Sequence, residues 1–221
     1  ACATVHTAID AVKVGMLGTA ATIDVVDAAL EEYRFHNVVL DPVLICKGQE
    51  PGHALDTDQA LKAELLPLAT FTTPNHFETE QLSGMTVRSV EDLTAAARRI
   101  HEISGAAVLA KGGMHLPGPD AVDVFVDGDT VEVLSAPKIG QSGVSGAGCS
   151  LAAAVTAAKP SGIGVENCWK VWASSDRRVC VGRSPAILPS CGRIAADDPA
   201  LRKSAAPYLR RKRTVAASQA S

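Results

Sequence analysis

The chain lacks any run of apolar residues long enough to cross a membrane. Its longest stretch of small and apolar residues, 151–158, falls well short of the roughly 20 residues that a membrane-spanning helix needs. The six cysteines form no C-x-x-C pair and no zinc-ligand spacing, so neither a metal knuckle nor a secreted disulfide framework is indicated. No basic start followed by an apolar core marks a signal peptide. With 47% apolar and 20% charged residues, the composition instead fits a cytoplasmic protein with one sizeable domain.

The chain also lacks a strong net charge, but the small value of −3 conceals two unlike parts. Residues 1–158 contain 9 Lys and Arg against 20 Asp and Glu, whereas residues 159–221 contain 12 against 4. The second part loses amphipathic periodicity and includes a basic run at 210–213. We therefore predict a folded domain over 1–162 and an atypical basic segment over 163–221 that packs poorly. The alternative is that the basic run contacts nucleic-acid phosphates. We consider this alternative the weaker one and therefore do not expect a nucleic-acid partner.

Buried strands are predicted where short apolar runs end in glycine or proline. These runs are 10–17, 37–43, 70–73 and 106–113. Residues 122–134 largely alternate apolar and polar side chains on both sides of Asp127-Gly128-Asp129, which predicts a β-hairpin.

Helices are predicted between these strands from apolar residues at three- and four-residue spacings. Four helices are expected here. The first begins after its N-cap Thr22, the second covers 58–66, the third begins after its N-cap Asn75, and the fourth covers 90–103. Ser89 is the expected N-cap of the last helix. The apolar residues expected on one face are Val25, Val26, Ala29, Leu30 and Tyr33 in the first helix and Leu93, Ala96, Ala97, Ile100 and Ile103 in the last. This order of elements predicts an α/β protein with a mainly parallel sheet, right-handed crossovers and an antiparallel addition.

A long loop is expected over residues 44–57, which include Cys46. Fourteen residues are many for a connection in a compact domain, which favours a lid over a simple connector. A surface excursion without function is the alternative.

The stretch 143–150 places three glycines just before the apolar segment 151–158, which predicts a turn that opens a helix near Ala147. The first N–H groups of a helix have no acceptor within it, and the helix dipole adds positive charge there, so such a turn suits an anion such as a phosphoryl group. Cys149 lies in the first turn, where the same positive end is expected to lower the pKa of its thiol. The alternative is a close-packed helix start with an ordinary buried thiol.

Four polar residues are predicted at or just beyond the ends of strands: Asp41, Asn75, Lys111 and Cys149. In open parallel sheets, ligands bind beyond the carboxyl ends of the strands. Asn75 has a structural explanation as well, because it can cap a helix with Glu78 as its capping-box partner.

These residues belong to motifs that resemble those of ribokinase-like vitamin kinases. The motifs are 41–48, 73–80, 111–113 and 145–149, and they occur in the order and spacing of that family. The chain is most similar to bacterial pyridoxal kinases of the hydroxymethylpyrimidine kinase-like branch. The resemblance implies a three-layer α/β/α fold with a mainly parallel sheet. The family begins with further strands and a glycine-rich segment that do not precede Ala1, so we expect an N-terminally truncated chain.

The resemblance implies an ATP-dependent transfer of phosphate to the hydroxymethyl group of pyridoxal or pyridoxine. Cys149 matches the catalytic base, and the backbone of Gly146, Ala147 and Gly148 matches an anion hole. Cys46 matches a lid cysteine that can add to a substrate aldehyde. The remaining matches are Lys13, Gly15 and Met16 at the substrate, Lys111, Gly112, Gly113 and Asn75 at the nucleotide, and Glu78 and Asp41 at Mg²⁺.

Two other interpretations stay open at this point. A hydroxymethylpyrimidine or phosphomethylpyrimidine kinase of thiamine biosynthesis would use the same site for a different ring. A catalytically inactive remnant would keep the site motifs without the substrate half. A heteroaromatic alcohol and ATP are the expected small-molecule partners, no membrane partner is expected, and a homodimer is expected by family analogy alone.

Overall fold

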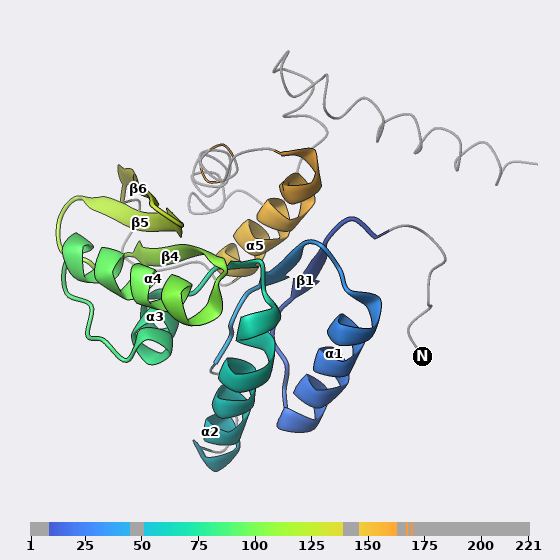
Figure 1. The fold of residues 1–221 in the computed structure, drawn as a ribbon. Helices are drawn as coiled ribbons and strands as arrows, with labels where there is room; N and C mark the ends of the chain where they lie inside the picture. Colours follow the sequence, from blue (N-terminus) through green and yellow to red (C-terminus); the bar gives the residue numbers. More distant parts are fainter. Residues whose placement is uncertain (1–8, 45–50, 139–145, 163–166, 168, 170–221) are drawn as a thin grey trace, which may run out of the picture. The chain divides into compact units, whose positions relative to one another are not determined.

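The computed structural model describes residues 9–44, 51–138, 146–162, 167 and 169 (Figure 1). Its strands form one six-stranded sheet in chain order. They are β1 (Val12–Val14), β2 (Val38–Leu40), β3 (Phe71–Thr72), β4 (Ala107–Gly113), β5 (Asp120–Asp127) and β6 (Thr130–Pro137). The first four strands are parallel, and β5 and β6 add an antiparallel hairpin. This arrangement confirms the predicted α/β fold with a mainly parallel sheet.

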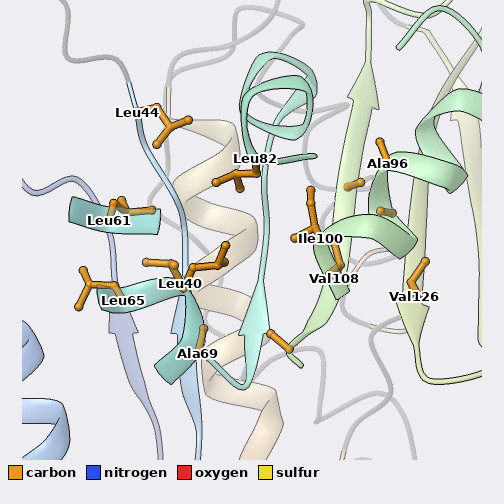
Figure 2. Close-up of a cluster of buried hydrophobic side chains, with 14 of the residues drawn as sticks. Leu40, Leu44, Leu61, Leu65, Ala69, Leu82, Ala96, Ile100, Val108 and Val126 are labelled. Atoms are coloured by element: carbon orange, nitrogen blue, oxygen red, sulfur yellow. The ribbon is translucent and has the colours of Figure 1, made fainter. Parts of the chain in front are cut away.

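The helices cover both faces of the sheet. They are α1 (Ala20–Tyr33), α2 (Pro51–Ala60) with a π turn (Leu61–Leu65) and a 3₁₀ turn (Leu66–Leu68), α3 (His76–Ser83), α4 (Val90–Ser104) and α5 (Ala147–Ala158) with a 3₁₀ turn (Lys159–Ser161). Side chains from α1, the turns after α2, α3 and α4 pack on one face. Figure 2 shows part of this cluster, with Leu61 and Leu65 from the π turn, Leu82 from α3, and Ala96 and Ile100 from α4 against the sheet. A second cluster joins α5 to the other face. The fold therefore has the predicted three layers.

Strand β2 shows why the buried strands are apolar on both sides. Val38 and Leu40 belong to the cluster under α1 to α4, whereas Val39 belongs to the cluster under α5. Because successive side chains of a strand point to opposite faces, a strand between two helical layers needs apolar residues at every position.

Helix α1 begins earlier than predicted, and part of its predicted apolar face is exposed. Its N-cap is Thr19, whose hydroxyl oxygen accepts a hydrogen bond from the N–H of Thr22 at 3.2 Å. Ile23 is fully buried, whereas Val25 and Tyr33 are 70% and 48% exposed. The expectation for Thr22, Val25 and Tyr33 was therefore wrong, whereas Leu30 is buried as predicted. In this helix, apolar residues fit more than one face, and the packing against the sheet selects the face that contains Ile23.

The predicted caps of α3 and α4 are confirmed. Asn75 caps α3 and Ser89 caps α4, each with a complete capping box. The predicted face of α4 is buried at Leu93, Ala96, Ala97 and Ile100, but the prediction for Ile103 was wrong, since this side chain is 48% exposed. It lies in the last turn of α4, next to the point where Gly105 ends the helix in the left-handed conformation (φ 70°).

The region predicted as a loop at 44–57 is partly helical, because α2 begins at Pro51. Proline is favoured in the first turn of a helix, where its missing N–H leaves no intrahelical hydrogen bond unmade. The helix predicted over 58–66 thus starts earlier, and Pro67 lies inside the 3₁₀ turn that follows. Residues 45–50, with Cys46, lie outside the described residues.

Trp169 lies beyond residue 162, the predicted end of the folded domain, yet its side chain is 5% exposed and belongs to the core under α5. The prediction for 163–221 otherwise lies outside the described residues. Within the part of the chain that the structure describes, no helix is long and apolar enough to cross a membrane.

Candidate functional site

Asp41 is the centre of the candidate site. It directly follows β2 and is 2% exposed, and the hydroxyl of Thr73 donates a hydrogen bond to its Oδ1 at 3.2 Å. Lys13 of β1 places Nζ 3.4 Å from Oδ2, and Lys111 of β4 places Nζ 3.6 Å from Oδ1. The parallel strands bring these residues together at the carboxyl ends of the strands, where the sequence predicts a site.

Two glycines make room for the lysines. A β-carbon on Gly15 would lie 2.8 Å from Lys13 Nζ, and one on Gly148 would lie 3.0 Å from Lys111 Nζ. Lys111 therefore reaches from the sheet to the first turn of α5. Lys13, expected at the substrate, is paired with Asp41, and Met16 beyond it is 63% exposed.

Cys149 lies in the first turn of α5, as predicted. The helix begins at Ala147, and Gly146 is its N-cap with φ 86°, in the left-handed region that favours glycine. Partial burial and the neighbouring Asp41 carboxylate, through its charge and a hydrogen bond, raise the pKa of the Cys149 thiol. The predicted lowering of this pKa was wrong, because the desolvation and the negative charge of Asp41 outweigh the positive charges nearby, which include Lys13 and Lys111.

Asn75 and Glu78 form the capping box of α3. Asn75 Oδ1 accepts the N–H of Glu78 at 2.9 Å, and Glu78 Oε2 accepts the N–H of Asn75 at 2.7 Å. Their structural role is thus confirmed. The backbone of Asn75 also bridges to Lys111, whose N–H donates to the carbonyl of Pro74 at 2.9 Å. The capping box is therefore attached to the strand that carries the site lysine.

Glu78 is 4% exposed, and its burial raises the pKa of its carboxyl to about 7. The hydrogen bond from Asn75 and the charge of Lys111 act in the opposite direction, and Asp41 adds to the upward shift. Glu78 is therefore electrostatically coupled to the Asp41 centre.

Asp41 and Glu78, the two carboxylates expected at Mg²⁺, are both buried. Asp41 Oδ2 is buried and accepts no hydrogen bond, although Lys13 lies near it. Among the described residues, no three His, Cys, Asp or Glu side chains form a metal-binding group. Mg²⁺ is commonly held by one or two carboxylates together with water and substrate phosphates, so a pair such as Asp41 and Glu78 fits this ion.

Gly112 and Gly113 have a structural explanation that the sequence did not suggest. A register shift interrupts the pairing of β4 and β5 at this point. A β-carbon on Gly112 would lie 2.5 Å from the carbonyl oxygen of Val122. Gly113 has φ 53°, and its N–H donates to Asp123 Oδ1 at 3.3 Å. The N–H of Gly113 is therefore directed to a carboxylate of the chain itself.

Sequence reasoning missed Thr73 and Asp123 as members of this region. Thr73 was treated as a strand residue, and Asp123 fitted the polar face of a hairpin. Both signals depend on neighbours distant in sequence: Asp41 for Thr73, and Gly113 and Trp169 for Asp123. Local periodicity contains no information on such contacts.

Comparison with known proteins agrees with this geometry. Residues 2–170 match the family model described as phosphomethylpyrimidine kinase. The pyridoxine kinase of Bacillus subtilis is 44% identical over 163 residues, which cover 72% of this chain and 59% of the relative. The hydroxymethylpyrimidine/phosphomethylpyrimidine kinase of the same organism is 36% identical over 168 residues, which cover 75% of this chain and 61% of the relative.

A solved structure leads to the same family. The structure of an ADP complex of Bacillus subtilis pyridoxal kinase matches with a TM-score of 0.67 and 42% identity, and the match covers 75% of this chain and 62% of that chain. The chain spans about three fifths of the length of these relatives. The chain belongs to the phosphomethylpyrimidine kinase family.

Proposed function

We propose that the protein is an ATP-dependent phosphotransferase that acts on the hydroxymethyl group of pyridoxal or pyridoxine. The observation that carries this proposal is the meeting of Asp41, Lys13 and Lys111 with Cys149 at the N-terminus of α5. This arrangement combines two cations, a candidate proton acceptor and a helix start suited to an anion. The 44% identity to a pyridoxine kinase supports the choice of substrate.

In the proposed reaction, the hydroxymethyl oxygen attacks the γ-phosphorus of ATP while the bond from that phosphorus to the oxygen of ADP breaks. The hydroxyl proton passes to Sγ of Cys149, which acts as the general base in its thiolate form, a minor form at neutral pH because burial and Asp41 raise the pKa of the thiol. Lys111 and Lys13 would hold the phosphate charge, together with the backbone of Gly146, Ala147 and Gly148. When bound, Mg²⁺ would supply Lewis-acid stabilisation of the phosphate oxygens, with Asp41 and Glu78 as its protein ligands.

Asn75 is proposed to act beside the nucleotide through the amide nitrogen that its capping role leaves unused. Gly112 and Gly113 allow the backbone of β4 to run close to β5, since a larger residue at Gly112 would collide with β5. Gly15 and Met16 remain candidates for the substrate side, with Cys46 as a proposed aldehyde-binding residue outside the described part of the chain.

The test is ATP consumption by the 221-residue chain with pyridoxal and with hydroxymethylpyrimidine, beside Cys149→Ala and a surface control, Asp127→Asn. Turnover on pyridoxal that Cys149→Ala abolishes and Asp127→Asn retains is the expected result. The 36% identity to a hydroxymethylpyrimidine/phosphomethylpyrimidine kinase supports the second candidate, which saturable turnover on the pyrimidine alone would favour. A folded chain that turns over neither alcohol would contradict both and favour an inactive remnant.

A further inference from the structure

Asp123 is the buried carboxylate on the α5 side of the sheet that the proposed chemistry does not use. It is 4% exposed. Its Oδ1 accepts the N–H of Gly113 at 3.3 Å, and its Oδ2 accepts the indole N–H of Trp169 at 2.7 Å. The N–H of Gly112 also contributes a hydrogen bond to this carboxylate. Asp123 therefore connects the end of β4 to Trp169, a residue 46 positions away in the chain.

Asp123 and Lys111 are opposite each other in the sheet and share a face. Lys111 pairs with Asp123 in the register of β4 and β5. Along β4, Lys111 follows the alternation of Leu109, which packs under α5, and along β5, Asp123 alternates with Phe125, which packs against the same cluster. Side chains of directly opposed residues lie close together on one face of a sheet. The carboxyl group of Asp123 thus lies beside the stem of Lys111.

The bulge in β4 links Asp123 to the direction in which Lys111 extends. The register shifts between Lys111 and Gly113, directly after the residue that supplies the ammonium group. Asp123 holds this bulge through the backbone of the two glycines that follow Lys111. Displacement of the carboxylate would therefore change both the backbone that carries Lys111 and the charge beside its side chain.

We propose that Asp123 is a positioning residue for Lys111, which it holds between Asp41 and the first turn of α5. This inference rests on the proposed function, in which Lys111 contacts the nucleotide phosphates. Lys111 acts on Asp123 in return, since its charge opposes the rise that burial causes in the pKa of the Asp123 carboxyl. Trp169 completes the arrangement by covering Oδ2 and excluding water from the carboxylate.

A test of the Asp123 charge must change the charge without placing two hydrogen-bond donors against each other. In Asp123→Asn, the side-chain NH₂ of the asparagine would face the N–H donor of either Gly113 or Trp169, because only its carbonyl oxygen can accept a hydrogen bond. Trp169→Phe removes the indole donor while keeping an aromatic ring. The informative comparison is therefore Trp169→Phe with and without Asp123→Asn, and Asp127→Asn at the exposed end of β5 is the matched control. Should the asparagine chain fail to fold, Asp123→Ser replaces it.

The first measurement is pulse acetylation of lysines with mass spectrometry in the absence of nucleotide. The Lys111 side chain is 11% exposed and that of Lys13 is 24% exposed, so Lys13 is the internal reference. We expect Asp123→Asn in the Trp169→Phe chain to increase Lys111 labelling about fivefold relative to Lys13, because a positioned lysine reacts only when it leaves its site. Equal labelling of Lys111 in the paired chains would overturn the proposal.

The second measurement is ADP affinity by calorimetry in a double-mutant cycle with Lys111→Ala. We expect Asp123→Asn to weaken ADP binding about tenfold when Lys111 is present and to have no further effect when it is absent. Independent, additive losses would mean that Asp123 is merely structural, which contradicts the proposal. Absence of ADP binding in the unmodified chain, with Lys111 labelling still dependent on Asp123, would overturn the proposed function and leave the positioning role standing.

Discussion

Gly148 and Gly112 are both glycines of the candidate site, but a β-carbon would meet different neighbours at the two positions. At Gly148 the nearest atom is the mobile end of Lys111, at 3.0 Å, whereas at Gly112 it is a backbone oxygen of β5, at 2.5 Å. A flexible ammonium group can move aside, while the backbone of a paired strand cannot. Substitution at the two positions therefore separates function from stability.

We expect Gly148→Ala to keep or raise the stability of the chain by up to about 1 kcal/mol, because alanine favours a helix. The same change displaces Lys111 and is expected to lower kcat/KM roughly 10-fold to 100-fold. Gly112→Ala is expected to cost about 3 kcal/mol or more through overpacking against β5. Urea unfolding and steady-state kinetics of both variants measure these effects. A Gly148→Ala chain with full activity would contradict the placement of Lys111.

Glu78 makes the stability of the chain depend on pH. Its carboxyl has a pKa of about 7 in the fold against an ordinary value of 4.5, so folding favours the protonated form. The resulting stability is fully present below about pH 4.5 and is lost as the pH rises through 7. Glu78→Gln mimics the protonated form and can retain the capping box. The loss of unfolding free energy between pH 5 and pH 8 should therefore be roughly 1–3 kcal/mol smaller in this variant.

Urea titrations of both chains at the two pH values, without divalent ions, measure this difference. Glu80→Gln is a suitable control, because Glu80 lies in the same helix and its Oε1 accepts a backbone hydrogen bond from Val87. An equal pH slope in the Glu78→Gln chain and the unmodified chain would show that Glu78 is already ionised in the fold.

At the scale of the element, the start of α1 distinguishes the structure from the sequence-based prediction. Thr19 caps the helix, and Thr22 lies in its first turn. Thr19→Ala is expected to cost about 1 kcal/mol of unfolding free energy, the usual value for loss of an N-cap. Thr22→Ala loses an exposed contact between two hydroxyl groups and should cost much less. Thermal unfolding of both variants shows which threonine is the N-cap. A larger loss of stability in Thr22→Ala would mean that Thr22 is the cap, as the sequence predicted.

The elements that were predicted correctly depend on short-range interactions. The capping boxes at Asn75 and Ser89 join residues three positions apart, and the turn at Gly128 needs a local positive φ. Burial of one helix face over another depends instead on how the helix meets the sheet, which explains the errors at Val25 and Ile103. The pairing of Lys13 with Asp41 depends on how the strands align. The sequence therefore predicted a site at the carboxyl ends of the strands but not this ion pair.

At the scale of the whole molecule, Trp169 is part of the folded domain although it lies beyond residue 162. The family model reaches residue 170, and Trp169 is buried under α5 with its indole N–H bound to Asp123. Periodicity is lost after α5, and the sequence therefore indicated an end at 162. A single large aromatic residue that packs on a distant strand leaves no periodic signal, which is why this contact was not predicted.

We propose that the domain requires the chain up to about residue 170 and that 175–221 contributes little to it. A chain ending after 170 should keep the unfolding free energy of the full chain, whereas one ending after 162 should lose roughly 3–5 kcal/mol, the usual cost of removing a buried tryptophan. Urea unfolding of the three chains measures this difference. Amide exchange provides the complementary measurement, because residues outside a cooperative core exchange rapidly. Strong protection across 175–221 would contradict the proposal and place the basic segment within the fold.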